Sequence, residues 1–61
     1  MIYENIKTLC KEKGITISEL ERELNFGNGV IGRWRESAPR IDNAKKVANY
    51  FGVTIERLLE E

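Results

Sequence analysis

Apolar residues recur at helical spacing along nearly the whole chain, and this periodicity restricts the fold more than any other feature of the sequence. Ile2, Ile6, Leu9 and Cys10 lie at positions i, i+4, i+7 and i+8, which places them on one face of an expected helix at residues 2–13. No strand pattern competes with the helical one over the length of the chain. The sequence therefore predicts an all-α fold.

Turn signals divide the remaining residues into four further short helices. Gly14 is expected to end the first helix in the left-handed conformation, and Thr16 or Ser18 to cap the second. Residues 25–29 are rich in residues that tolerate positive φ and predict a turn, while Pro39 separates the third helix from the fourth. The inward-facing residues expected on the second to fourth helices and in the turn are Leu20, Leu24, Phe26, Val30, Ile31, Trp34, Ile41, Ala44, Val47, Ala48 and Phe51. The fifth helix carries Ile55, Leu58 and Leu59, more apolar residues than one covered side needs.

The boundaries of the last three helices follow from the same kind of signal. The third helix is expected over residues 27–36. Gly52 is expected to close the fourth helix, and Thr54 to cap the fifth. The prediction is a single domain, residues 1–61, of five short helices with tight connections.

Size and composition exclude several classes of protein. A chain of 61 residues forms one domain with a modest core. Cys10 is the only cysteine and histidine is absent, so neither a disulfide nor a four-ligand zinc site is expected, and Cys10 is expected to be a small buried hydrophobe. No apolar run approaches the roughly 20 residues that cross a bilayer, and the first residues lack the features of a signal peptide. We therefore expect a cytoplasmic protein without membrane segment, metal, cofactor or small-molecule ligand.

Basic residues concentrate in the middle of the chain, although the net charge is zero. Residues 27–46 contain five Lys or Arg and two Asp or Glu, whereas residues 1–26 and 47–61 are each net acidic. This distribution either marks a face that binds a polyanion or has arisen by chance.

Residues 14–36, Gly-Ile-Thr-Ile-Ser-Glu-Leu-Glu-Arg-Glu-Leu-Asn-Phe-Gly-Asn-Gly-Val-Ile-Gly-Arg-Trp-Arg-Glu, resemble the helix-turn-helix of the phage-repressor and Cro-like (XRE-type) regulators. Residues 40–55, with the joint Phe-Gly-Val-Thr, resemble the fourth and fifth helices of that fold. The resemblance implies a lambda-repressor-like DNA-binding domain with its helix-turn-helix at about residues 17–36. Residues 27–36 would then be the recognition helix, which lies in the major groove of double-stranded DNA.

Four positions of this helix correspond to the base-reading positions of the family. They are Asn28, Gly29, Gly32 and Arg33. Asn28 is suited to bind an adenine edge and Arg33 a guanine edge, each through two hydrogen bonds. The alternatives are that Asn28 only caps the helix and that Arg33 is a solvated surface residue. The glycines have no side chain, so they would let the backbone approach DNA closely, each at a cost of about 1 kcal/mol in helix propensity.

The resemblance also implies phosphate contacts from residues that flank the recognition helix. The candidates are Ser18, Arg35, Ser37, Arg40, Asn43 and Lys46, of which Arg40 and Lys46 are the preferred pair. Such contacts orient the domain and make its affinity depend on salt without reading sequence. Each of these side chains has an equally simple interpretation as solvated surface.

The second helix departs from the family pattern. Ile17 replaces a glutamine that braces the recognition helix, and Asn25 replaces the turn glycine. Glu21 replaces a small residue, and we expect its aliphatic part to pack while its carboxylate turns out to solvent. Glu19 and Glu23 add negative charge that would weaken DNA binding if either faced a phosphate.

The function expected from these features is sequence-specific binding of double-stranded DNA by a repressor-like transcriptional regulator. A homodimer, formed through Ile55, Leu58 and Leu59, would bind an inverted repeat. The alternative is a helix-turn-helix module of the antitoxin or adaptor kind that binds protein, which the zero net charge favours. An enzyme is not expected, since the sequence offers no histidine and no nucleophile–base pair.

Overall fold

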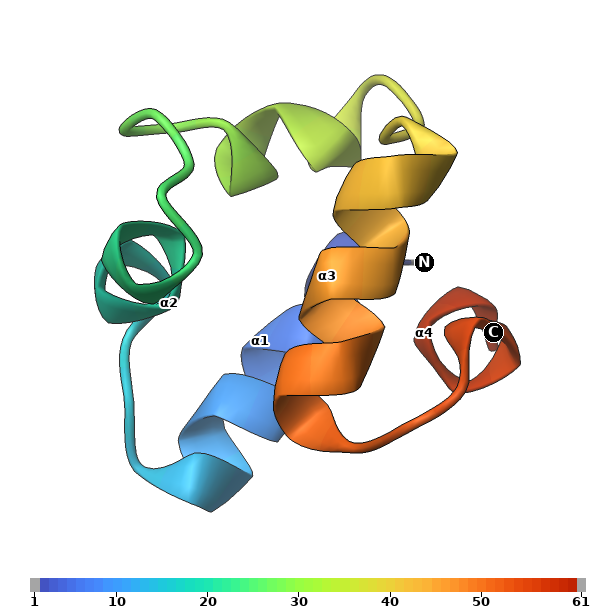
Figure 1. Cartoon of the computed structure of the whole chain (residues 1–61), viewed down its shortest axis with the longest axis horizontal. Helices are drawn as coiled ribbons and strands as arrows, with labels where there is room; N and C mark the ends of the chain where they lie inside the picture. The colour runs from blue at the N-terminus through green and yellow to red at the C-terminus, as the bar shows by residue number, and fades with distance from the viewer. Residues whose placement is uncertain (1, 61) are drawn as a thin grey trace.

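The computed structural model describes residues 2–60 and shows four α-helices and one 3₁₀-helix in that range (Figure 1). The elements are α1 (Ile2–Lys13), α2 (Ile17–Glu23), η1 (Ile31–Arg35), α3 (Ile41–Phe51) and α4 (Ile55–Leu59). No strand occurs among the described residues, which confirms the predicted all-α class. The prediction of five α-helices was wrong for the third element, which is a 3₁₀-helix.

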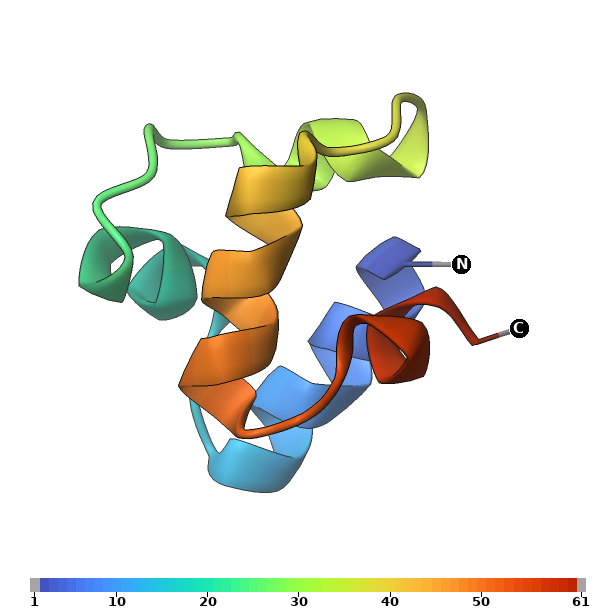
Figure 2. The same ribbon diagram turned by 45° about the vertical axis from the view of Figure 1, so that its right-hand side comes forward.

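Helix α1 contacts more of the other elements than any other helix does. It contacts α2, η1 and α4, and α3 packs against α4. Figures 1 and 2 show α1 behind α3, with α2 and α4 on opposite sides and η1 across one end. The buried apolar side chains form one cluster: Ile2, Ile6, Leu9, Cys10, Leu20, Ile31, Trp34, Val47, Ala48 and Leu58. The predicted stripe of α1 is therefore buried in full.

Local cap chemistry fixes most helix ends, as the sequence predicted. Gly14 and Gly52 adopt left-handed conformations, with φ of 81° and 69°. The hydroxyl of Thr16 accepts a hydrogen bond from the Glu19 amide at 3.0 Å, and the Glu19 carboxylate accepts one from the Thr16 amide at 2.8 Å. This reciprocal pair is a capping box. At α4, the Thr54 hydroxyl accepts a hydrogen bond from the Arg57 amide at 3.1 Å.

The predicted core was wrong at one position, Ile41. Ile41 is 64% exposed and Leu59 is 54% exposed. Ile41 shares a helical face with the buried Ala44 and Ala48, but it is the first residue of α3 and lies outside the apolar cluster. Leu58, in contrast, is fully buried, so its side chain belongs to the core of the single chain and does not form the dimer contact expected for it.

The third element differs from the recognition helix predicted at residues 27–36. Residues 28–30 form a turn, and the 3₁₀-helix begins only at Ile31. Gly29 has φ of 87°, which is incompatible with a right-handed helix at that position. Three glycines within six residues explain this outcome, because each lowers the intrinsic preference for α-helix by about 1 kcal/mol relative to alanine.

The two ends of the described chain are joined by a side chain. The Nδ2 atom of Asn5 in α1 donates hydrogen bonds to the main-chain oxygens of Leu58, at 2.7 Å, and Glu60. This contact ties the last turn of α4 to α1. Within residues 2–60, none of the helices is both long and apolar enough to span a bilayer.

Candidate nucleic-acid interface

Residues 24–30 connect α2 to η1 and include a left-handed turn, which gives these elements the order of a helix-turn-helix. Asn25 follows α2 with φ of 60°, the left-handed conformation that was predicted for it. The Phe26 amide then donates a hydrogen bond to the Glu21 main-chain oxygen at 2.8 Å. In Figure 1 the chain runs from α2 through this turn to η1 along one edge of the molecule.

Buried apolar side chains hold the inner side of this unit. Leu20 of α2 and Ile31 of η1 are fully buried, and Trp34 is 6% exposed. The Phe26 ring meets the Trp34 ring edge-on, with centroids 5.9 Å apart and planes at 68°. Trp34 is thus a core residue, as predicted, and the outer surface of residues 28–35 remains free for contact with a ligand.

Glu21 is the main correction to the predicted site. Its side chain is 4% exposed instead of turning out to solvent. Its Oε1 atom accepts a hydrogen bond from the Gly29 amide at 3.2 Å, and its Oε2 atom accepts one from the Ile31 amide at 2.9 Å. A buried carboxylate needs such partners, because an unpaired charge in the interior is costly. The signal in the sequence was a glutamate mid-helix, shortly before a glycine-rich turn.

The proposed base-reading residues all lie in the 28–35 segment. Asn28, Gly29 and Arg33 are exposed, and Gly32 is half-buried. Asn28 does not cap the 3₁₀-helix, since Val30 occupies that position and no side-chain cap bond is present there. Among residues 2–60, no acidic side chain forms an ion pair with Arg33. The side chains of Asn28 and Arg33 are therefore available to a ligand.

A shallow groove separates Asn28 from α2. It has a volume of about 290 Å³ and is lined by Ser18, Glu21, Arg22, Phe26 and Asn28. One wall is the exposed side of α2 and the other is the turn, so the groove follows the outer seam of the helix-turn-helix. We refer to it as the Asn28 groove.

The two glycines of the predicted site have different backbone states. Gly29 has positive φ, so glycine is favoured there by conformation alone. Gly32 has ordinary φ, and a Cβ atom built there would meet only the Nη2 atom of Arg35, at 3.8 Å. The protein itself thus leaves room for a side chain at Gly32.

Two of the predicted phosphate ligands have partners within the chain. The guanidinium of Arg35 lies over the Tyr3 ring, 5.1 Å from its centroid, and its Nε atom donates to the Gly32 oxygen at 3.1 Å. Arg40 lies 3.7 Å from the Asp42 carboxylate, and both side chains are mostly exposed. The other four candidates are exposed, apart from the half-buried Asn43: they are Ser18, Ser37, Asn43 and Lys46.

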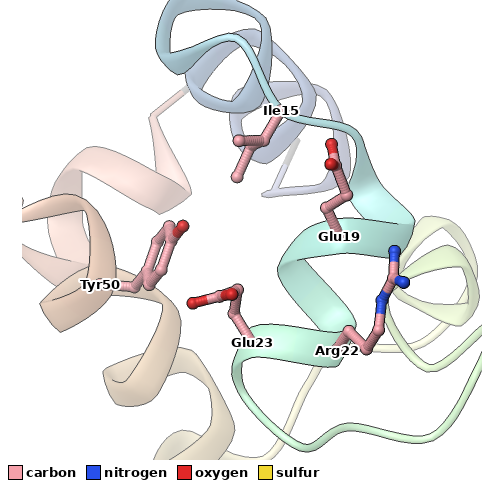
Figure 3. A pocket seen from close by; sticks show the side chains of 5 residues that line it. All are labelled: Ile15, Glu19, Arg22, Glu23 and Tyr50. Atoms are coloured by element: carbon pink, nitrogen blue, oxygen red, sulfur yellow. The ribbon is translucent and has the colours of Figure 1, made fainter.

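The acidic residues of α2 other than Glu21 line a different depression. This pocket, of about 450 Å³, is bounded by Ile15, Glu19, Arg22, Glu23 and Tyr50. Figure 3 shows the Glu23 carboxylate directed toward Tyr50 of α3. Neither Glu19 nor Glu23 lines the Asn28 groove. Their charges therefore lie outside the groove that borders the predicted base-reading residues.

Helix α2, a left-handed turn and an exposed segment anchored by Ile31 and Trp34 define a DNA-binding domain of the helix-turn-helix class. A family model described as Helix-turn-helix, of the XRE type, matches residues 6–58. The chain belongs to this family of Cro- and repressor-like helix-turn-helix proteins. No curated protein and no solved structure matches the chain.

Proposed function

We propose that this protein is a repressor-like transcriptional regulator of the cytoplasm that binds a specific sequence of double-stranded DNA and has no catalytic activity. One observation carries this proposal: Asn28 and Arg33 are exposed on a short segment whose inner residues, Ile31 and Trp34, are buried. Side chains presented from a rigid base can read base edges in the major groove with defined geometry.

The proposed contacts divide between reading and positioning. Arg33 binds guanine O6 and N7, and Asn28 binds adenine N6 and N7. Lys46 binds a phosphate directly. Arg40 binds a phosphate after it leaves its ion pair with Asp42, and this exposed pair is weak because solvent screens it. Arg35 is the least suited to this role, because Tyr3 and the Gly32 oxygen already bind its guanidinium.

We further propose that the protein acts as a homodimer on an inverted repeat. The exposed side chain of Leu59 and the half-buried Ile55 supply the apolar contact. Sedimentation of the wild type and of Leu59→Ser, measured over a range of concentrations, tests this contact. The proposal expects a dimer that the substitution weakens, and a wild type that remains monomeric at every concentration would contradict it.

Selection of bound duplexes from a random pool tests the central proposal. The wild type is expected to enrich one sequence with two-fold symmetry, and its affinity for that sequence is expected to fall steeply with salt. Failure to enrich any sequence, together with salt-insensitive binding, would contradict the proposal.

The second candidate function is a protein-binding module of the antitoxin or adaptor kind. The zero net charge and the two carboxylates that line the pocket in Figure 3 favour it. This candidate predicts no salt-sensitive DNA binding, so the same selection distinguishes the two functions.

A further inference from the structure

We propose that Glu21 is a positioning residue that fixes the shape of the 28–35 segment and thereby controls discrimination between bases. The inference rests on the DNA-binding function proposed above. It assigns no contact between Glu21 and DNA; the carboxylate acts through the backbone that carries Asn28 and Arg33.

Apart from the bonds within η1, the main-chain hydrogen bonds that shape the start of the 28–35 segment are bonds of short turns. The Val30 amide donates to the Gly27 oxygen at 3.2 Å, and the Arg33 amide is shared between the Gly29 and Val30 oxygens at 3.3 and 3.2 Å. Glycine populates positive and negative φ about equally, so the glycines of this stretch add conformational freedom. A five-residue 3₁₀-helix is also held less firmly than an α-helix, since its hydrogen-bond geometry is poorer.

Glu21 supplies the constraint that the segment lacks, and it does so at three points. Its main-chain oxygen accepts from the Phe26 amide at 2.8 Å. Its Oε1 and Oε2 atoms accept from the Gly29 amide at 3.2 Å and the Ile31 amide at 2.9 Å. The two carboxylate oxygens bind amides that are two residues apart. Any shift or rotation of the turn relative to α2 therefore breaks at least one of these two hydrogen bonds.

The base-reading residues lie directly between and beside these anchors. Asn28 lies between the anchored Phe26 and Gly29, and Arg33 follows the anchored Ile31 by two residues. A change in the Gly29 or Ile31 anchor therefore reorients both reading side chains. Hydrogen bonds to base edges depend on orientation, whereas contacts with phosphates tolerate shifts, so the effect is expected in discrimination before it is seen in overall affinity.

The test uses Glu21→Gln, with Glu23→Gln as the matched control. Glutamine keeps the size of the side chain but replaces one acceptor oxygen by an NH₂ group, which cannot accept from an amide. Glu23→Gln makes the same change of charge on the same helix, at a side chain directed toward Tyr50 (Figure 3). Two quantities are measured below the unfolding temperature: the exchange rates of the Gly29 and Ile31 amide protons, and the affinity ratio between the selected duplex and duplexes with one base pair changed.

Glu21→Gln is expected to accelerate exchange of at least one of the two amides and to lower the affinity ratio about tenfold, as loss of a charge-assisted hydrogen bond implies. Glu23→Gln is expected to change neither quantity. Glu21→Asp, which keeps both oxygens on a shorter side chain, is expected to retain more discrimination than Glu21→Gln, and it replaces that variant if Glu21→Gln does not fold.

Faster amide exchange with an unchanged affinity ratio would show that Glu21 serves stability alone, which overturns the proposal. The proposal is also overturned if the amide protons of Gly29 and Ile31 exchange as slowly in Glu21→Gln as in the wild type. The same criterion applies to Glu21→Asp where that variant is used. Failure of the proposed function gives a different result, because the wild type itself would then show no preference among duplexes. In that case the discrimination claim falls, and amide exchange alone shows whether Glu21 fixes the segment.

Discussion

Gly29 and Gly32 lie three residues apart, but only Gly29 has a backbone conformation that favours glycine. At Gly29 the positive φ favours glycine whether or not DNA is bound. At Gly32 neither φ nor a neighbouring atom requires glycine, so a role in function explains the residue better than a role in folding. The sequence predicted close approach to DNA for both glycines. It could not distinguish them, since residue types alone do not give the φ of Gly29.

Gly32→Ala is expected to leave stability unchanged or raise it by up to about 1 kcal/mol, because alanine is the better helix former. If DNA approaches the backbone at this position, the same substitution weakens binding. Gly29→Ala is the matched comparison, and it is expected to cost about 1–2 kcal/mol because of the positive φ. Denaturant unfolding and duplex titration measure both effects, and unaltered DNA affinity in Gly32→Ala would refute the close approach.

Burial raises the pKa of the Cys10 thiol. The neutral thiol is the form that the core accommodates, so its contribution to stability is complete below the pKa of an unfolded thiol, about 8.5. That contribution is lost as the pH rises through the higher pKa of the folded state. Relative to Cys10→Ala, the wild type is expected to lose stability above about pH 8.5, by no more than about 1.4 kcal/mol per pH unit. A difference between the two free energies of unfolding that stays constant with pH would contradict this expectation.

At the scale of elements, the sequence predicted the helix ends whose chemistry is local. Gly14, Thr16, Gly52 and Thr54 each act within a few residues of their own position, and all four end or cap a helix as expected. The 28–35 segment failed as a predicted α-helix because its glycines disfavour that helix and because a carboxylate from α2 binds two of its amides. Such a contact depends on how two elements pack, which local propensity does not specify.

Thr16→Ala removes the acceptor of the α2 capping box and is expected to cost about 1 kcal/mol. For a domain of this size, that loss corresponds to a decrease in Tm of about 4–8 °C. Thr8→Ala is the control, since Thr8 is an exposed residue inside α1 and alanine favours the helix there. Thermal unfolding followed by circular dichroism compares the two variants, and equal Tm values would argue against the cap.

At the scale of the whole molecule, the arrangement of elements could be predicted from apolar spacing and the family resemblance, and so could the exposure of Asn28 and Arg33. The partners of charged side chains could not, because they come from distant parts of the chain. Arg35 lies over Tyr3 of α1, and Glu21 binds amides beyond the turn. Both contacts change the predicted site: the first makes Arg35 less available to phosphate, and the second adds a positioning residue.

Lys46→Ala is expected to reduce the slope of log affinity against log salt by about one unit for each bound protomer, since each protomer loses one phosphate contact. Its affinity is expected to fall by the same factor for every duplex, because phosphate contacts carry no sequence information. Lys11→Ala is the control, since Lys11 lies in the last turn of α1, at the end of the molecule away from η1 (Figure 1). Equal slopes for the two variants would exclude Lys46 as a phosphate ligand.

If the 28–35 segment reads DNA sequence, replacing the long exposed side chain of Arg33 with alanine changes which base pairs are preferred. Affinities of the wild type and the variant are measured for the selected duplex and for duplexes with each base pair changed in turn. Arg33→Ala is expected to cost about 1–3 kcal/mol for each protomer on the selected duplex and to remove the preference at one base pair of each half-site only. Equal binding of both proteins to every duplex would contradict sequence reading by this segment.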